Sequence, residues 1–354
     1  MKIDLKDNKI LLAKCTHYTI FGRLLKDKMT NIKRIGVFTS GGDAPGMNAA
    51  IRAVVRAGIY YNKEIFGIYR GYEGMIEGDF VPMDVRSVSN ILQRGGTILK
   101  SSRSAEFKTV EGRKKAFEQL KKHKIDGLIG IGGDGSFKGM HHLFKEHRMP
   151  YVCLPGTIDN DIPGTDFTIG FDTATNTAVE AIDKIRDTAL SHNRLFFIEV
   201  MGRDSGYIAI NAGIAGGAVS VIIPEEETSV DALVEKLNEG AKQNKSSSLV
   251  IVAEGGKSGS AMEIAKKVKE KSSYFDTKVT ILGHLQRGGT PTYSDRVLAS
   301  KMGVAAVEKL IEGATDIMIG VIHNEIIQNS FEDLISEPKS IHKDDLRIAK
   351  ILSI

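Results

Sequence analysis

Three short segments combine glycines with carboxylates in a way that suits phosphate chemistry. They are SGGDAPG at 40–46, GGDGS at 132–136 and PGTIDND at 155–161. Glycines let backbone N–H groups approach an anion closely, and the positive end of a following helix dipole favours negative charge. One carboxylate beside such loops can hold Mg²⁺, and another can accept the proton of an attacking hydroxyl. The three segments therefore indicate phosphoryl transfer, with cationic side chains nearby; the candidate cations are Arg103, Arg203 and Arg287.

Each segment also has a purely structural interpretation. The first is compatible with a tight strand-to-helix turn, and Asp134 with a helix N-cap, although Ser, Thr or Asn would cap equally well. The third resembles a cluster of Asx turns. No G-x-x-x-x-G-K-[ST] sequence occurs in the chain, which excludes a standard P-loop nucleotide hydrolase.

The elements that must position these loops are strands and helices in alternation. Short β-rich runs at 35–39, 64–69, 127–131 and 151–154 alternate with amphipathic stretches at 47–60, 109–122 and 136–146. Because the carboxyl ends of parallel strands share one edge of a sheet, the three loops are expected to converge there.

A second α/β series follows the first. Ala174, Ala178, Ile182, Ile185 and Ala189 share one helical face, and the later runs 195–200, 219–223, 249–253 and 279–282 read as strands. The alternation predicts an α/β protein with two lobes and mostly parallel sheets. A length of 354 residues fits two domains.

Composition excludes several classes of protein. The net charge of +4 is carried by Met1–Thr30, while the remainder has equal numbers of acids and bases and the chain has no Trp, which argues against nucleic-acid binding. The sequence contains no apolar run long enough to predict a membrane span. Cys15 and Cys153 make no disulfide framework, so a reducing, cytoplasmic setting is expected. Met29 precedes the first strand and could be a start codon, so residues 1–31 are treated as a tail.

Six segments in this order resemble the phosphofructokinase family, in its single-length, ATP-dependent bacterial form. They are SGGDAPGMNAAIR at 40–52, RGGT at 94–97, GGDGS at 132–136, PGTIDND at 155–161, EVMGR at 199–203 and GHLQRGG at 283–289. The resemblance runs from about Ile32 to the C-terminus. It implies two Rossmann-like three-layer α/β/α lobes with the active site in the cleft between them. The larger, ATP-binding lobe would comprise 32–168 and 285–338, and the smaller, sugar-phosphate lobe 169–284 and 339–354.

The resemblance also implies a reaction and its residues: ATP phosphorylates the 1-hydroxyl of fructose 6-phosphate. Asp159 would be the general base, and Thr157 and Arg203 would stabilise the transferring phosphoryl group. Mg²⁺ would be held by Asp134 and Asp161. The expected ATP contacts are Gly42, Tyr72, Arg103, Ser104, Gly133, Asp134, Gly135 and Ser136. The expected sugar-phosphate contacts are Thr157, Asp159, Asp161, Arg194, Met201, Gly202, Arg203, Glu254, Lys278, His284 and Arg287.

Arg194 and the residue at 278 reach the phosphate from a neighbouring subunit in this family, which implies a homotetramer. Plainer interpretations stay open for three of these residues. Arg194 is also typical of a solvated surface charge, Glu254 of a strand-end carboxylate, and Met201 of core packing.

Departures from the family pattern carry further expectations. Pyrophosphate-dependent members have Asp where Gly135 stands and Lys where Gly156 stands, so ATP is favoured as donor. Lys278 stands where Arg is usual. Because an ammonium cannot form the paired hydrogen bonds that a planar guanidinium makes to phosphate, we expect weaker binding of the sugar phosphate. The alternatives are a pyrophosphate-dependent enzyme or a nucleotide-binding regulatory subunit.

The family's effector site, which binds ADP or phosphoenolpyruvate between subunits, is only partly retained. Four basic residues match it: Arg52, Arg56, Arg186 and Lys245. Val85 stands where Arg is usual, Val219 where a metal-binding Glu is usual, and Gln243 where Lys is usual. We therefore expect ADP activation to be weak or absent.

Overall fold

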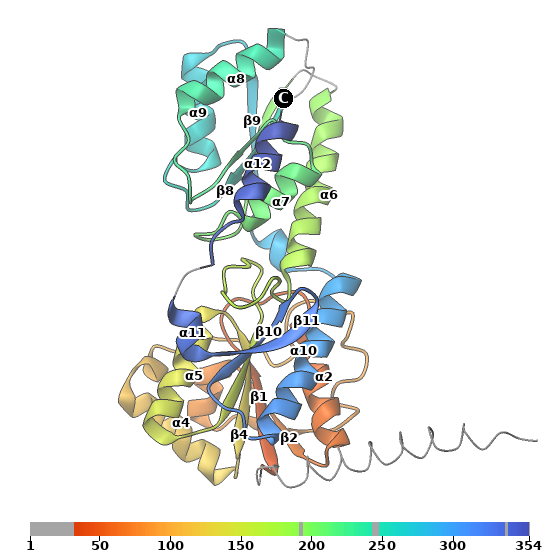
Figure 1. Ribbon diagram of the computed structural model, residues 1–354, viewed down its shortest axis with the longest axis vertical. Coiled ribbons are helices and arrows are strands. Elements are labelled where there is room, and N and C mark those ends of the chain that lie inside the picture. Colours follow the sequence, from red (N-terminus) through yellow and green to blue (C-terminus); the bar gives the residue numbers. More distant parts are fainter. Residues whose placement is uncertain (1–31, 191–193, 243–247, 337–338, 354) are drawn as a thin grey trace, which may run out of the picture.

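The computed structural model describes residues 32–190, 194–242, 248–336 and 339–353. The predicted tail, and two effector-site positions, Gln243 and Lys245, lie outside the described residues. Figure 1 shows two lobes stacked along the long axis of the molecule, each built around its own sheet.

The first sheet has seven strands in the order β11-β10-β5-β4-β1-β2-β3. The central strands are parallel, whereas β3 and β11 run antiparallel at the two edges. The strand bounds are β1 Arg34–Thr39, β2 Glu64–Ile68, β3 Phe80–Met83, β4 Gly127–Gly132, β5 Tyr151–Pro155, β10 Ile317–Ile322 and β11 Glu325–Ser330.

Helices cover both faces of this sheet because its central strands are apolar on both sides. On one face, α2 (Met47–Tyr60) packs against α10 (Tyr293–Ile311); on the other lie α3 (Gly71–Glu77), α4 (Val110–Lys122) and α5 (Asp134–His147). Alternate residues of β4 divide between the two cores: Ile129 faces the α2 side and Leu128 the α5 side. The first lobe is therefore a three-layer sandwich.

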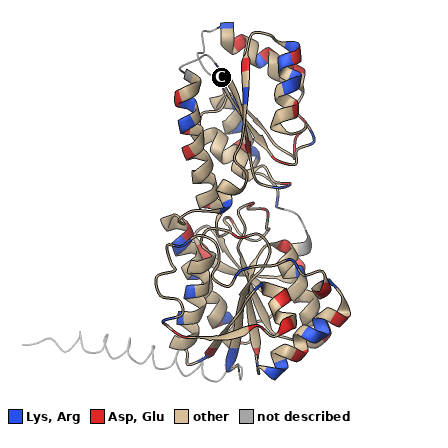
Figure 2. Cartoon of the chain, turned by 180° about the vertical axis from the view of Figure 1, so that it is seen from behind, with Lys and Arg blue, Asp and Glu red and all other residues tan. Residues whose placement is uncertain are grey.

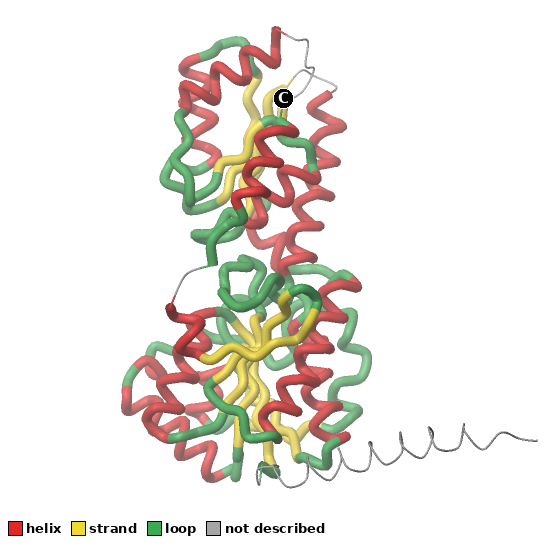
Figure 3. The backbone as a smooth tube through the Cα atoms, in the orientation of Figure 1, coloured by secondary structure: helices red, strands yellow, loops and turns green. Residues whose placement is uncertain are grey.

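The second sheet is entirely parallel, in the order β7-β8-β6-β9. Its strands are β6 Arg194–Val200, β7 Ser220–Ile222, β8 Ser248–Ala253 and β9 Asp276–Ile281. Three helices, α6 (Phe171–Leu190), α7 (Tyr207–Ala215) and α12 (Lys343–Leu352), lie on one side of it. On the other side are α8 (Val230–Lys242) and α9 (Ala261–Lys271), as the tube in Figure 3 shows.

The predicted fold class, an α/β protein with two mostly parallel sheets, is confirmed. The first sheet takes its strands from 34–155 and 317–330 and the second from 194–281, so the chain crosses between them more than once. The exact lobe bounds stay a prediction. Figure 2 shows basic and acidic residues interspersed over the outer helices of both lobes. Of the helices in the described ranges, none is long and apolar enough to cross a membrane.

Candidate active site

The three glycine-rich loops lie together at the carboxyl edge of the first sheet. Ser40 N donates to Ile131 O at 3.0 Å, and Gly156 N donates to Gly132 O at 2.9 Å. A Cβ at Gly132 would lie 2.5 Å from Ser40 O, so only glycine permits this approach. The loops after β1, β4 and β5 therefore form one surface.

The first loop turns sharply into α2. Gly46 has φ 106, in the left-handed region that favours glycine, and α2 begins at the next residue. Arg287 reaches this loop from the short helix η2 (Gly283–Arg287) and donates from Nη1 to Asp43 O at 3.2 Å. A Cβ at Gly42 would lie 2.5 Å from the same nitrogen. The guanidinium predicted to bind sugar phosphate thus rests on the loop predicted to bind ATP.

The second loop opens α5, two residues earlier than the sequence predicts. Asp134 forms an ion pair with Lys138, one helical turn along, at 2.6 Å between Oδ2 and Nζ, and both side chains are exposed. Apart from its chain neighbours and the backbone of its own helix, no described atom lies within 4 Å of a Cβ built at Gly135. Gly133 lies beside Thr157 of the third loop. This helix start is open toward solvent, as an anion site requires.

Residues from two other segments support these loops. Tyr72 is buried, its ring stacks on Phe107 with centroids 3.9 Å apart, and its hydroxyl donates to Ser136 O. Burial raises the pKa of Tyr72 well above its usual value. Its position beneath α5 is that of a support, and its contact with ATP stays a prediction. Ser104 Oγ accepts a hydrogen bond from Phe107 N at 3.1 Å, while Arg103 is exposed.

The third loop carries two carboxylates, of which Asp159 is buried and Asp161 is half-buried. Asp159 is 6% exposed; its N–H donates to Thr157 Oγ1 at 3.2 Å, and its carbonyl accepts from Ser205 Oγ at 3.0 Å. Among the described residues, nothing forms a hydrogen bond with Asp159 Oδ1. The backbone of Asp159 is thus fixed by two hydrogen bonds, while one oxygen of its buried carboxyl has no partner in the described structure, an arrangement that suits proton abstraction.

Burial is the main influence on both carboxyls of this loop. It raises the pKa of Asp159, against the opposing charges of Arg287 and then Arg203. Burial also raises the pKa of Asp161, and the negative charges of Asp159 and, more weakly, Asp134 add to the effect. Asp161 therefore lies in the repulsive field of two other carboxylates, an arrangement that a divalent cation relieves.

The second lobe presents its own loop to this edge. Glu254, at the end of β8, accepts from Arg203 N at 3.0 Å and from Gly202 N at 3.3 Å. Arg203 has φ 56, in the left-handed region, and the hydrogen bonds from the N–H groups of Gly202 and Arg203 to Glu254 help to hold this backbone conformation. Met201 is 8% exposed and packs in the core, as its plainer interpretation expected.

Gln286 is a residue of this site that the sequence analysis did not single out. It is fully buried, accepts from Met201 N at 2.8 Å and donates from Nε2 to Ala174 O at 3.4 Å. It fixes η2, whose His284 is exposed, against β6 and α6. The position of Gln286 in GHLQRGG, between the predicted phosphate ligands His284 and Arg287, could have indicated it, because a buried side-chain amide needs hydrogen-bond partners of its own.

Arg194 and Lys278 lie on the neighbouring strands β6 and β9. Asp276 pairs with both: its Oδ2 lies 3.1 Å from Arg194 Nε and its Oδ1 lies 2.8 Å from Lys278 Nζ. These two side chains lower the pKa of Asp276. The structure thus brings the two predicted cations together at the edge of the second sheet, where β9 has no further strand among those described.

Three of the four basic residues of the predicted effector site are described: Arg52 and Arg56 lie on α2, and Arg186 lies on α6. Burial, followed by the charge of Arg56 one turn away, lowers the pKa of Arg52. Arg186 donates to the carbonyls of Gly216 and Gly217. Val219 packs against the core of the second sheet. An apolar side chain so placed provides no metal ligand.

Two parallel-sheet lobes, with glycine loops and a buried carboxylate at one sheet edge, are typical of α/β enzymes that transfer phosphoryl groups. A family model described as phosphofructokinase matches residues 34–310. The chain belongs to the phosphofructokinase family, which confirms the resemblance drawn from its six motifs.

Curated relatives match over nearly their whole length. An ATP-dependent 6-phosphofructokinase of Cytophaga hutchinsonii is 54% identical over 91% of this chain and 98% of its own. ATP-dependent 6-phosphofructokinase 1 of Thermus thermophilus is 53% identical over 91% of this chain and all of its own. A solved phosphofructokinase of Pichia pastoris in the T-state has a TM-score of 0.81 and 36% identity, over 86% of this chain. This chain spans 36% of that longer yeast chain.

Proposed function

We propose that this protein transfers the γ-phosphoryl group of ATP to the 1-hydroxyl of fructose 6-phosphate, giving fructose 1,6-bisphosphate and ADP, a step of glycolysis. The near-complete coverage of ATP-dependent 6-phosphofructokinases at 53–54% identity supports this activity. The single structural observation that carries it is Asp159, buried at the sheet edge with Oδ1 unpartnered among the described groups.

The chemistry follows from the side chains around Asp159. Its carboxylate accepts the proton of the sugar 1-hydroxyl while that oxygen attacks the γ-phosphorus, and the bond from phosphorus to the bridging oxygen of ADP breaks. Burial favours this proton transfer because it raises the pKa of Asp159. Thr157 and Arg203 stabilise the charge on the transferring group, and Arg203 is already close enough to Asp159 to lower its pKa.

The residues present fit a magnesium ion. After burial and Asp159, the negative charge of Asp134 adds to the raised pKa of Asp161 across the two loops. Carboxylates beside phosphate-binding glycines are the ligands that Mg²⁺ uses together with nucleotide phosphates. Asp134 and Asp161 would hold it, and when bound it neutralises phosphate charge. The described residues include no cluster of three or more His, Cys, Asp or Glu that could hold a metal ion.

ATP rather than pyrophosphate is the donor that the two diagnostic glycines favour. The space beyond Gly135 is open in the described structure, as a nucleotide requires. At Gly156 a Cβ would lie 2.9 Å from Ile131 Cγ2 and 3.2 Å from Met47 Cε. The Lys of pyrophosphate-dependent relatives would therefore displace core side chains here.

The sugar phosphate is bound in the cleft between the lobes, with Glu254 and Gly202 at the sugar and His284 and Arg287 at the 6-phosphate. To reach it, Arg287 exchanges its contact with Asp43 O for phosphate oxygens. Arg194 and Lys278 act on the active site of a neighbouring copy in a homotetramer. Lys278 is exposed on the edge strand β9, which ends at the exposed Ile281, and Arg194 is half-buried on the neighbouring strand β6; this sheet edge supports such an interface. The lobe bounds predicted above and a cytoplasmic location complete the proposal.

ADP activates this protein weakly or not at all, because Val85, Gln243 and Val219 stand where the effector site usually has two cations and a metal-binding acid. The remaining cations still suit a small anion such as phosphoenolpyruvate.

A coupled assay of fructose 1,6-bisphosphate formation tests the donor and the effector together. It is run with MgATP or pyrophosphate, each with and without ADP. Turnover with MgATP that ADP leaves unchanged is expected. Turnover with pyrophosphate alone contradicts the donor assignment, and strong activation by ADP contradicts the effector assignment. Turnover with neither donor favours a nucleotide-binding regulatory subunit.

A further inference from the structure

Lys339 is a mostly buried cation that the proposed chemistry does not use. It lies where the chain returns from the first lobe to α12 of the second, and its Nζ donates to Asp166 O at 3.0 Å. Its ammonium also lies over the ring of Tyr207, 4.9 Å from the centroid. Burial lowers the pKa of Lys339 to about 8, against the opposing charges of Asp166 and Asp161. A cation kept in such a place needs partners that compensate its desolvation.

The carbonyl that Lys339 binds lies just after the third loop, 155–161, which carries Asp159 and is here called the catalytic loop, and is bonded to it. Asp166 O also accepts from Asn160 Nδ2 at 3.1 Å, and Asn160 Oδ1 accepts from Thr168 N at 3.0 Å. Asn160 stands between the two carboxylates of the loop, is 2% exposed and has φ 52. Its side chain therefore fixes the backbone from which Asp159 and Asp161 project, and Lys339 holds the far end of that clamp.

The ring beneath the ammonium belongs to the other half of the site. Tyr207 begins α7, four residues after Arg203, and its hydroxyl donates to Ser340 O at 2.7 Å. Between the two, Ser205 donates to Asp159 O at 3.0 Å and caps Tyr207 N at 3.4 Å. Lys339 thus contacts Tyr207, in the segment that follows Arg203, as well as Asp166, whose carbonyl is bonded to the loop that carries Asp159.

We propose that Lys339 is a positioning residue that sets the catalytic loop against the Arg203 segment by joining Asp166 O to the ring of Tyr207. This inference rests on the proposed function. Its positive charge also faces Asp161, so its loss changes both the spacing and the charge of the site. Small displacements of reacting groups are costly, with about a hundredfold in rate for a shift near 1 Å.

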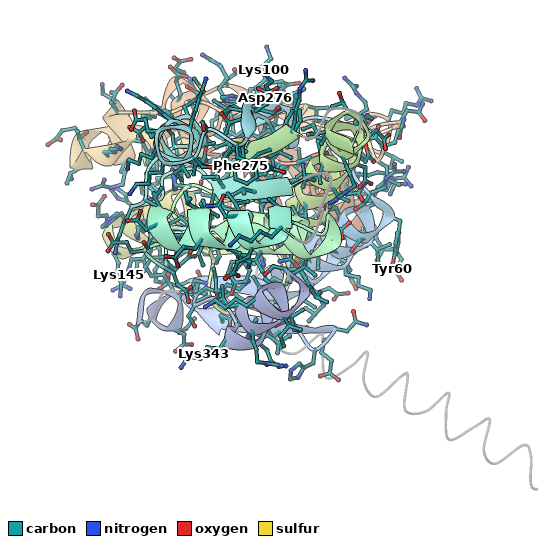
Figure 4. The ribbon with its side chains drawn as sticks, turned by 90° about the horizontal axis from the view of Figure 1, so that it is seen from above. Tyr60, Lys100, Lys145, Phe275, Asp276 and Lys343 are labelled. Carbon is teal, nitrogen blue, oxygen red and sulfur yellow. The ribbon has the colours of Figure 1, made fainter. Side chains whose placement is uncertain are left out.

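Two variants separate positioning from mere folding. Lys339→Met keeps an unbranched apolar side chain one atom shorter and removes the ammonium, whereas Lys339→Arg keeps a cation and an N–H donor. Lys343→Met is the matched control, because Lys343 is an exposed lysine of the neighbouring helix α12, at the outer rim of the molecule in Figure 4. Steady-state rates are measured with MgATP and fructose 6-phosphate, together with thermal unfolding.

The expected result is a kcat at least about tenfold lower for Lys339→Met, with KM for ATP within about threefold of the parent value. Lys339→Arg should recover most of the rate, and Lys343→Met should match the parent. Equal kcat for Lys339→Met and the parent overturns the proposal, as does a loss that Arg fails to recover although both variants fold.

Hydrogen exchange gives a readout that does not depend on activity. Amides in 159–168 should exchange faster in Lys339→Met than in the parent, and at the parent rate in Lys339→Arg. Unchanged exchange refutes the positioning role even if the parent protein proves to phosphorylate another substrate. An inactive parent with faster exchange in Lys339→Met refutes only the proposed function.

Discussion

Replacing Asp159 isolates the general base from the rest of the loop. In Asp159→Ser and in the nearly isosteric Asp159→Asn, the backbone contacts with Thr157 and Ser205 remain, because they use the N–H and C=O of residue 159. What is lost is the carboxylate, whose Oδ1 has no other partner in the described structure. A general base contributes about 10²- to 10⁴-fold, which corresponds to roughly 3–5 kcal/mol of barrier.

We therefore expect kcat to fall by at least about 10²-fold in both variants, with ATP affinity nearly unchanged. Removing a buried charge should leave stability equal or slightly higher, since burial already raises the pKa of this carboxyl. The coupled assay gives kcat, calorimetry gives ATP affinity, and Asp183→Asn on the exposed side of α6 serves as control. A kcat within threefold of the parent would refute the assignment of Asp159 as base.

Three further changes test other parts of the account. Gly135→Asp should fold normally, since its Cβ meets open space, yet lower kcat/KM for MgATP at least about tenfold by placing a carboxylate where phosphate binds; steady-state kinetics would show this. Lys278→Arg should lower KM for fructose 6-phosphate about fivefold, because a guanidinium grips phosphate with two bonds; an unchanged KM contradicts the role of this position. Burial raises the pKa of Asp295 from 3.8 to about 6, so the folded state binds a proton at this carboxyl more tightly than the unfolded state does. The contribution of Asp295 to folding stability is therefore fully present below pH 3.8 and is lost as the pH rises through 6. In urea unfolding, the parent should thus lose up to about 3 kcal/mol relative to Asp295→Asn over that range, and parallel pH profiles would contradict the shift.

The strands and helices around the three loops could be predicted from the sequence because each combines a clear period with a glycine boundary. The run 47–60 is a helix over the predicted range, and 127–131 and 151–154 are strands within a residue or so. The edge strand β3 and the hairpin of β10 and β11 were not anticipated. Pro82 within β3 argues against a strand there, because proline cannot donate to a sheet. The hairpin joins the sheet only through the pairing of β10 with β5, which is far away in the sequence.

The site shows the same division. The residue types in 155–161 indicate carboxylate chemistry, but only the fold shows which oxygen of Asp159 is free and that Arg287 rests on the first glycine loop. The hydrogen bonds of Gln286 to Met201 and of Lys339 to Asp166 could not be found by spacing, because these partners lie far away in the sequence. Long-range contacts of single polar side chains leave no periodic trace in the sequence.

The most direct test of the central claim is to follow a labelled γ-phosphoryl group from ATP into sugar, comparing the parent protein with Asp159→Asn. Phosphorus NMR of the product locates the new ester. The account predicts label at the 1-position of fructose 1,6-bisphosphate with the parent protein and at least about 10²-fold slower transfer with the variant. Label that stays in ATP, appears at another position of the sugar, or moves equally fast with the variant would contradict it.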